Sequence, residues 1–387
     1  MCLLRQGTIY YWDMQKTILS LLLLLTPLSL YGEALPLERL NLPEGFQIEV
    51  YAEVPGARQM ALGSDGILFV GSMRSGKVHV VVDKNGDFKA DEVKVIASEL
   101  SLPTGVAFRG GDLYVAAVDR ILRYPDIEKN LDRAPKPEVI TDKLPDETHH
   151  GWKFLDFGPD GLLYFAVGTP CNICLSENPQ FASILRMDVD AGTEPEIVAS
   201  GIRNTVGFDW HPTTRELWFT DNGRDMLGDT IPPCELNRIT RTGQHFGYPY
   251  YHGKSLPDPE FGQKGEAATH YIEPELLLDP HVAPLGMMFY SGDMFPASFR
   301  NQVIIPEHGS WNRSPEAGHT GYRLTIARKT NEGMSYEIFI DGWLNDNNES
   351  WGRPVHLVQL SDGSLLLADD KAGVIYRITY KSITPRA

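Results

Sequence analysis

The segment HHGWKFLDFGPDGLLYFAVG, residues 149–168, contains two short apolar runs separated by Asp160-Gly161. Asp-Gly supplies the positive φ angles that a two-residue hairpin loop requires, so this segment predicts a tight β-hairpin. The same order of a polar or proline start, an apolar strand, a turn and a second apolar strand recurs along the chain. Four further copies begin at Arg58, Pro103, Arg203 and Arg353, and a looser sixth copy begins at Ala283.

These repeats predict the fold class. Most copies are followed by a third strand with polar residues pointing outward, and helical periodicity is almost absent. Four short antiparallel strands repeated at intervals of tens of residues predict an all-β fold, a six-bladed β-propeller of four-stranded antiparallel blades. The strand FQIEVYAEV, residues 46–54, precedes the first copy and is expected to complete the last blade, which ends near Tyr380. A β-sandwich with irregular hairpins is the alternative, and the regular repetition argues against it.

The composition limits the possible partners. The 387 residues are 42% hydrophobic, and 35 Lys and Arg against 51 Asp and Glu give a formal charge of −16. Such a surface repels nucleic acids and anionic membranes, so nucleic-acid binding is excluded.

The N-terminus predicts export. Lys16 precedes the apolar run at 17–31, and the small residues Gly32 and Ala34 follow it as a cleavage site. We therefore expect residues 1–34 to be a signal segment and residues 35–387 to be a single propeller domain, periplasmic or secreted, with no stable membrane insertion after cleavage. An uncleaved anchor is the alternative.

Three cysteines remain after such cleavage: Cys171, Cys174 and Cys234. An oxidising compartment permits a disulfide between two of them, and the sequence leaves open which two. A structural zinc site would need a second cysteine pair or nearby ligating histidines, and neither is evident.

The repeats also predict a common rim. In an antiparallel hairpin, the start of the first strand and the end of the second lie at the same edge, and the first strands of a propeller line its channel. Residues at the strand starts are Arg58, Gln59, Thr104, His149, His150, Arg203, Asn204 and Arg353. Residues at the returning ends are Gly168, Thr169, Asp221, Asn222, Gly223, Glu307, His308, Asp369 and Asp370.

This rim predicts a ligand pocket. We expect His149 and His150 to face one pocket, with arginines from other blades opposite them. Arg203 and Arg353 would suit bidentate binding of a carboxylate or phosphate. The alternative is that the histidines bond only to loop carbonyls and that each arginine pairs with an acid of a neighbouring blade.

A second candidate for metal binding is the segment DKNGDFKADE, residues 83–92, whose oxygen-bearing side chains resemble a calcium loop. Lys94 stands where a bidentate glutamate would be needed, so a polar hairpin tip without metal is the alternative.

Five segments together resemble the quinoprotein glucose/sorbosone dehydrogenase family: HHGWKFLDFGPDGLLYFAVG, SGIRNTVGFDWHP, TDNGRDMLGD with CELNRI and FGYPY, IPEHGSWNRS, and GRPVHLVQLSDGSLLLADDKAGVIYRI. The resemblance covers roughly residues 42–380. It implies a soluble six-bladed propeller that uses pyrroloquinoline quinone (PQQ) and Ca²⁺ to oxidise sugars.

The resemblance implies roles for four residues in particular. His150 aligns with the general base that removes the sugar hydroxyl proton while hydride passes to the quinone. Arg203 and Asn204 align with an Arg-Asn pair in which the arginine meets the reactive side of the cofactor. Arg353 aligns with an arginine that binds a PQQ carboxylate.

The remaining site residues are less regular. By resemblance, Gly223 and Arg224 belong to the cofactor loop, and their backbone carbonyls hold the calcium. His308 stands where some relatives have a cofactor-contacting lysine. Cys234 replaces an acidic residue of sorbosone-type relatives, and His149 replaces an aspartate of the glucose-oxidising branch. Cofactor affinity and sugar preference are therefore expected to differ from that branch.

The sequence thus predicts a PQQ-dependent sugar dehydrogenase that acts on an aldose or aldehydic sugar and passes electrons to an unknown acceptor. Two alternatives are a calcium-dependent lactonase-like hydrolase and a non-catalytic binding propeller. A hydrolase would need several Asn, Asp or Glu side chains around the metal, whereas His and Arg prevail here.

Overall fold

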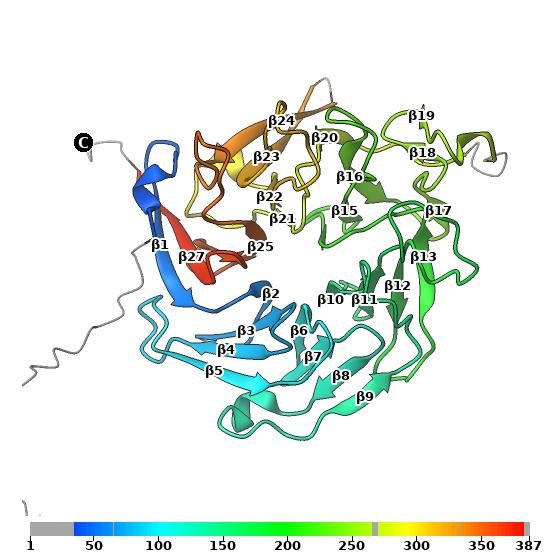
Figure 1. The fold of residues 1–387 in the computed structure, drawn as a ribbon. Coiled ribbons are helices and arrows are strands. Elements are labelled where there is room, and N and C mark those ends of the chain that lie inside the picture. The colour runs from blue at the N-terminus through cyan, green and yellow to red at the C-terminus, as the bar shows by residue number, and fades with distance from the viewer. Residues whose placement is uncertain (1–34, 65, 265–269, 332, 383–387) are drawn as a thin grey trace, which may run out of the picture. The chain divides into compact units, whose positions relative to one another are not determined.

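The computed structural model in Figure 1 describes residues 35–64, 66–264, 270–331 and 333–382. Residues from Pro36 onward form one compact unit. The predicted signal segment, residues 1–34, lies outside the described residues. No helix in the described part of the chain is long and apolar enough to cross a membrane.

Six sheets follow one another around a centre, as Figure 1 shows, which confirms the predicted six-bladed propeller. Blade 1 consists of β2 (Ala57–Leu62), β3 (Ile67–Ser72), β4 (Val78–Val82) and β5 (Glu92–Ala97). Blade 2 consists of β6 (Gly105–Arg109), β7 (Asp112–Ala116), β8 (Ile121–Tyr124) and β9 (Glu138–Thr141). Blade 3 consists of β10 (Leu155–Phe157), β11 (Leu163–Val167), β12 (Ser183–Met187) and β13 (Glu196–Ser200).

The other three blades have the same antiparallel order. Blade 4 consists of β14 (Phe208–Trp210), β15 (Leu217–Asp221), β16 (Pro233–Ile239) and β20 (Leu276–Pro280). Blade 5 consists of β21 (Met288–Phe289), β22 (Val303–Glu307), β23 (Arg323–Thr330) and β24 (Gly333–Ile340). Blade 6 consists of β25 (Pro354–Gln359), β26 (Leu365–Asp369), β27 (Val374–Tyr380) and β1 (Phe46–Glu53).

The two ends of the chain close blade 6, as the sequence predicts. β1 pairs antiparallel with β27, with Phe46 opposite Tyr380. The Phe46 ring packs edge-on against Phe295, with a centroid distance of 4.8 Å. This pairing covers the edge of β27, which would otherwise expose unpaired backbone groups.

The turn glycines have positive φ angles, but the turn at Asp160-Gly161 is longer than the two-residue loop that the sequence predicts, because the last strand pair there is Phe157 opposite Leu163 and residues 158–162 form the loop. Gly66, Gly111, Gly161 and Gly363 have φ angles of 75°, 97°, 83° and 86°. Neighbouring blades then pack through apolar side chains, for example Leu155 of β10 in one buried cluster with Tyr114 of β7. Each fully buried side chain of this kind contributes about 1.5–3 kcal/mol.

Blade 3 carries an addition that the repeat pattern does not predict. β17 (Gln244–His245) pairs parallel with β13 as a fifth strand. The connection between β16 and β20 also holds a small ribbon of β18 (Tyr251–His252) and β19 (Leu256–Pro257). This connection carries Tyr248, which contacts the candidate site described below.

The calcium-like segment at 83–92 uses its carboxylates for its own turn. Asp83 accepts hydrogen bonds from the backbone N–H groups of Gly86 and Phe88, both at 2.8 Å. Asp91 accepts one from Lys84 N at 2.7 Å. These hydrogen bonds stabilise the segment as a polar hairpin tip. This is the arrangement that the metal-free alternative describes.

Candidate functional site

A cavity of about 1300 Å³ opens where the repeats begin. Strands β10 and β14 start only at Leu155 and Phe208, so the residues before them form loops that line the cavity. The predicted rim residues that line it are Arg58, His150, Arg203, Asn204, Asn222, Gly223, His308, Arg353 and Asp370. Residues from blades far apart in the sequence therefore share one cavity.

The cavity is cationic although the chain is acidic. Its lining contains five Arg or Lys residues and three Asp or Glu residues, whereas the whole chain has a formal charge of −16. A concave surface of one charge focuses the electrostatic potential and favours a ligand of opposite sign. The cavity therefore suits an anionic ligand, as its arginines predict.

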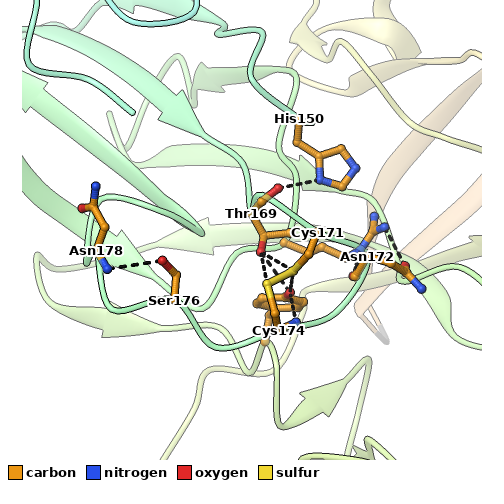
Figure 2. Close-up of a disulfide and its surroundings, with 9 residues drawn as sticks. His150, Thr169, Cys171, Asn172, Cys174, Ser176 and Asn178 are labelled. Atoms are coloured by element: carbon orange, nitrogen blue, oxygen red, sulfur yellow. Dashed lines mark hydrogen bonds between the residues drawn. A yellow bond between two sulfur atoms is a disulfide. The ribbon is translucent and has the colours of Figure 1, made fainter. Parts of the chain in front are cut away.

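His150 lies in this cavity with a defined tautomer. Its ring Nδ1 lies 2.9 Å from the carbonyl oxygen of Thr169, as Figure 2 shows. A carbonyl can only accept a hydrogen bond, so Nδ1 carries the proton and Nε2 keeps its lone pair. The pKa of His150 is lowered to about 2, mainly by burial and next by the positive charge of Arg203 and by the neighbouring His149. The ring is therefore a neutral imidazole with a free proton acceptor.

We expect the His150 ring to stay neutral from pH 5 to pH 8. Its folded pKa lies below its ordinary value, so the neutral form prevails at any pH above the lowered value. Histidine ¹⁵N spectra of the ligand-free chain should show one ring with a pH-independent Nδ1–H tautomer, assigned by its loss in the His150→Gln variant. A ring that titrates near pH 6.5 would contradict this assignment.

Backbone geometry and one buried lysine fix the loop that carries His150. His150 has a φ of 50°, a left-handed conformation that is costly for a residue other than glycine. A Cβ at Gly151 would lie 2.2 Å from the carbonyl oxygen of Glu147, so only glycine fits there. Lys153 is buried and donates a hydrogen bond from Nζ to Gly151 O at 2.7 Å. These constraints fix the direction of the His150 side chain.

Gly168 packs directly against His150. A Cβ at Gly168 would lie 2.7 Å from the His150 Cβ and 3.0 Å from Asn204 Oδ1. We expect Gly168→Ala to displace both side chains, to cost about 1–3 kcal/mol of stability and to lower turnover by roughly tenfold or more. Thermal unfolding and steady-state kinetics measure the two effects, and unchanged turnover in a folded variant would show that Gly168 does not control the His150 position.

Arg203 is held by neighbours on most of its N–H groups. Its Nε donates to Asn172 O at 2.9 Å, and its Nη2 donates to Asn172 Oδ1 at 3.0 Å and to Asp225 Oδ2 at 3.2 Å. Its Nη1 lies 3.3 Å from Asn222 O. Only one N–H of Nη1 is left for a ligand, so this conformation does not allow the bidentate contact that the sequence predicts for Arg203.

Asp221 fixes the backbone at the same position. Its carboxylate accepts hydrogen bonds from the backbone N–H groups of Arg203 and Asn204, at 2.8 Å and 2.7 Å. The Oδ1 atom of Asn204 is buried without a hydrogen-bond partner among the described residues. Asn204 therefore keeps an unused polar atom at the cavity, although Asp221 itself stays behind it.

The opposite wall contains a second charged group. Asp370 accepts hydrogen bonds from His308 Nε2 at 2.8 Å and from Arg58 Nη1 at 2.9 Å. Although burial opposes it, the neighbouring His308 and Arg58 hold the pKa of the Asp370 carboxyl well below its usual range. Burial lowers the pKa of His308 to about 4. Arg353 donates to the carbonyls of His308 and Gly309, at 2.8 Å and 2.6 Å.

Two predicted residues lie elsewhere. His149 is exposed and does not line the cavity, so the expectation that both histidines face one pocket is wrong. Its ring instead lies against that of His150, with a centroid distance of 4.1 Å. The side chain of Arg224 pairs with Asp258 at 2.6 Å and with Glu260 at 3.1 Å, outside the cavity lining. The calcium prediction concerns only its backbone carbonyl and stays a prediction.

Several other rim residues have structural roles. Gln59 exchanges hydrogen bonds with the backbone of Leu155, and Glu307 pairs with Arg323. Asp369 accepts from the backbone N–H of Arg353 at 2.8 Å. None of Gln59, Glu307 and Asp369 lines the cavity, because their side chains are satisfied inside the blades.

Two of the three cysteines in the described residues form a disulfide. Cys171 and Cys174 form a disulfide, and Cys234 is free and buried. Burial raises the pKa of the Cys234 thiol to about 12, so this side chain stays protonated. In the described ranges, no group of three or more His, Cys, Asp or Glu residues could hold a metal ion.

Sequence reasoning missed two contributors. The sequence predicts Arg58 at the rim but assigns it no binding role. Its position at the start of the first strand of blade 1 is the signal that could have suggested such a role. Asn172 stands between the two cysteines of a C-x-x-C pair, and no pattern in the sequence links it to Arg203, 31 positions away.

Comparison with known proteins identifies the relatives of this architecture. The sequence model described as glucose/sorbosone dehydrogenase matches residues 116–307. The chain belongs to the glucose/sorbosone dehydrogenase family. A second family model, described as TrAA12-like, matches residues 242–381 of this family member.

Individual relatives extend the match to nearly the whole chain. An uncharacterised protein of Borreliella burgdorferi is 32% identical over 378 residues, covering 95% of this chain and 97% of that one. The holo PQQ domain of pyranose dehydrogenase from Coprinopsis cinerea is 19% identical, with a TM-score of 0.71 over 88% of this chain and 97% of that one. The calcium structure of the Trichoderma reesei family AA12 enzyme is 17% identical, with a TM-score of 0.73 over 88% and 97% of the two chains. These two structures share the fold of the family member described here.

Proposed function

We propose that this protein is a PQQ-dependent oxidoreductase that oxidises an aldose or an aldehydic sugar of the sorbosone or glucose type. Membership of the glucose/sorbosone dehydrogenase family supports the reaction class. The observation that carries the proposal is the neutral His150, whose free Nε2 lies in a cavity with a cationic lining. A proton acceptor beside an anion-binding wall is what oxidation of a hydroxyl by an anionic cofactor needs.

The residues present fit such a cofactor. PQQ is a planar quinone with three carboxylates, and arginine is the side chain best suited to bind carboxylates. Among the described residues that line the cavity, Arg58 Nε, Trp152 Nε1 and Asn204 Oδ1 are buried without hydrogen-bond partners. Unsatisfied buried polar atoms cost free energy that a polar ligand recovers.

The residues divide into three groups in this proposal. Arg353 and Arg58 bind carboxylates on one wall, next to His308. Arg203 and Asn204 contact the reactive side from the opposite wall. The carbonyls of Gly223 and Arg224 hold a Ca²⁺ ion, which prefers such oxygen ligands. When bound, the quinone supplies the two-electron acceptor that protein side chains lack.

His150 acts as the general base in this proposal. Its Nε2 accepts the proton of the substrate hydroxyl, and the Nδ1–H bond to Thr169 O stabilises the resulting imidazolium. The low pKa of the ligand-free ring comes mainly from burial and next from the charge of Arg203. An anionic ligand in the cavity offsets that charge and raises the pKa of His150 toward the working pH, where a base is most effective.

Reconstitution tests the proposal. We expect the purified chain to reduce an artificial dye with aldoses or aldehydes only after PQQ and Ca²⁺ are both added. Titration of intrinsic fluorescence measures PQQ binding separately from turnover. If PQQ neither binds nor supports turnover, the quinoprotein assignment is wrong, and lactone hydrolysis with Ca²⁺ becomes the next assay.

We also propose that the mature protein is periplasmic or secreted and begins near residue 35. N-terminal sequencing of the protein from its native cell tests this, and an intact N-terminus at Met1 or Met14 would contradict it.

A further inference from the structure

We propose that the loop closed by the Cys171–Cys174 disulfide is a positioning element of the active site, in which Asn172 holds the guanidinium of Arg203. The inference rests on the proposed function for the meaning of the site, but its geometry is independent of any ligand. Figure 2 shows the disulfide loop beside His150 and Thr169.

Asn172 uses every polar atom of its side chain for this purpose. Its Oδ1 accepts hydrogen bonds from Arg203 Nη2 at 3.0 Å and from Asp225 N at 2.8 Å. Its Nδ2 donates to Asp225 O at 3.0 Å. Its backbone oxygen accepts from Arg203 Nε at 2.9 Å. The side chain of Asn172 therefore joins the guanidinium to the loop that carries Asp225.

The disulfide fixes the segment that contains Asn172. Cys171 and Cys174 lie on either side of it, so the bond closes a loop of four residues. The buried Tyr248 supports this loop, since its hydroxyl accepts from Cys174 N at 3.0 Å and lies 3.0 Å from Thr169 Oγ1. A loop closed in this way has few conformations, which keeps both Asn172 acceptors in place.

Thr169, two residues before Cys171, contacts both functional residues. Thr169 N donates to the backbone oxygen of Arg203 at 2.9 Å, and Thr169 O accepts from His150 Nδ1 at 2.9 Å. His150 belongs to the loop before blade 3 and Arg203 to the loop before blade 4. Thr169 thus joins the proposed base to the backbone of Arg203, and the adjacent disulfide loop holds the Arg203 guanidinium through Asn172.

The consequence is a single orientation for Arg203. With Nε and Nη2 committed to Asn172 and Asp225, the guanidinium presents only Nη1 to the cavity. Without the Asn172 side chain, Arg203 loses one acceptor and the Asp225 backbone loses two hydrogen bonds, one to Oδ1 and one from Nδ2. The guanidinium would then exchange between orientations, and its charge would no longer lie at one fixed place relative to His150.

The first experiment uses the ligand-free full chain. Phenylglyoxal modifies accessible arginines, and peptide mass spectrometry measures the rate at Arg203 and Arg58 in the same sample. Both are buried, but Arg58 pairs with Asp370, whereas Arg203 contacts Asn172. We expect Asn172→Ala to raise the rate at Arg203 by about tenfold, because a hydrogen bond to a charged group is lost, and to leave Arg58 unchanged. Asn178→Ala is the matched control, since Asn178 is exposed and caps only Gln180 N.

If Asn172→Ala unfolds, the modification rate will rise at both arginines. A second variant then tests the same role. The double variant Cys171→Ser/Cys174→Ser opens the loop and leaves Asn172 present. We expect it also to raise the rate at Arg203 relative to Arg58. If the ratio of the two rates stays at the wild-type value in the folded variants, the positioning role is wrong.

Kinetics of the PQQ-loaded protein give a separate measurement. We expect Asn172→Ala to lower kcat by about tenfold through misplacement of Arg203, with the substrate KM changing less. If wild type shows no PQQ-dependent turnover, the proposed function fails while the arginine labelling still decides the positioning role. A wild-type kcat in Asn172→Ala would overturn the inference for catalysis.

Discussion

The variant His150→Gln is expected to lower kcat by about a hundredfold or more, as loss of a general base typically does. Glutamine can still donate a hydrogen bond to Thr169 O from its amide, but it offers no basic nitrogen in place of Nε2. The loop should therefore keep its conformation, and PQQ affinity should stay close to wild type. Stopped-flow reduction by sugar and equilibrium titration of PQQ measure the two properties.

The matched control for this variant is His319→Gln. His319 also lines the cavity, but its Nδ1 contacts only the hydroxyl of Ser310, at 3.0 Å. Its kcat should stay near the wild-type value. If His150→Gln keeps wild-type turnover, His150 is not the base, and the free Nε2 in the cavity has another use.

The variant Arg353→Ala is expected to weaken PQQ binding by roughly tenfold to a hundredfold, the range of about 1.5–3 kcal/mol for hydrogen bonds to charged groups. The Arg353 guanidinium is fixed by the carbonyls of His308 and Gly309 and lies 5.3 Å from the centroid of the Tyr322 ring. Such fixation reduces the entropy lost on binding. Calorimetric titration of the ligand-free protein with PQQ measures the change.

Arg74→Ala is the control for charge alone, since Arg74 is exposed at the same cavity. We expect it to change PQQ affinity less than Arg353→Ala does. An unchanged affinity in Arg353→Ala would remove this arginine from cofactor binding. A change in the KM for sugar with no change in PQQ affinity would instead assign it to the substrate.

Arg58 and Asp370 form a charged pair in the same cavity lining as Arg353. Arg58 comes from blade 1 and lies against Asp370, which follows β26 of blade 6. Closure of the propeller places these blades next to each other, as Figure 1 shows. Asp370 neutralises part of the charge, but the Nε of Arg58 remains buried and unpaired. This unused donor lies beside Arg353 in the same cavity lining.

Local patterns determined the fold of this protein. The Asp-Gly turns and the two apolar runs around them predict hairpins because each depends only on neighbouring residues. The assignment of the strand at 46–54 to the last blade is confirmed. It could be predicted because the last strand of that blade would otherwise leave its backbone groups unpaired. The same periodicity places His150, Arg203 and Arg353 at one rim, since the first strands of all blades start on the same side.

The tertiary structure decided what each rim residue contacts. His149 and His150 are adjacent in the sequence, yet His150 lines the cavity and His149 is exposed outside it. The proton position on His150 follows from Thr169 O, and the orientation of Arg203 follows from Asn172. These partners belong to loops between blades, and no repeat or spacing records which loops will meet. The sequence therefore determined the frame and the chemical types at its rim, whereas packing between blades determined the pairs that give those groups their chemistry.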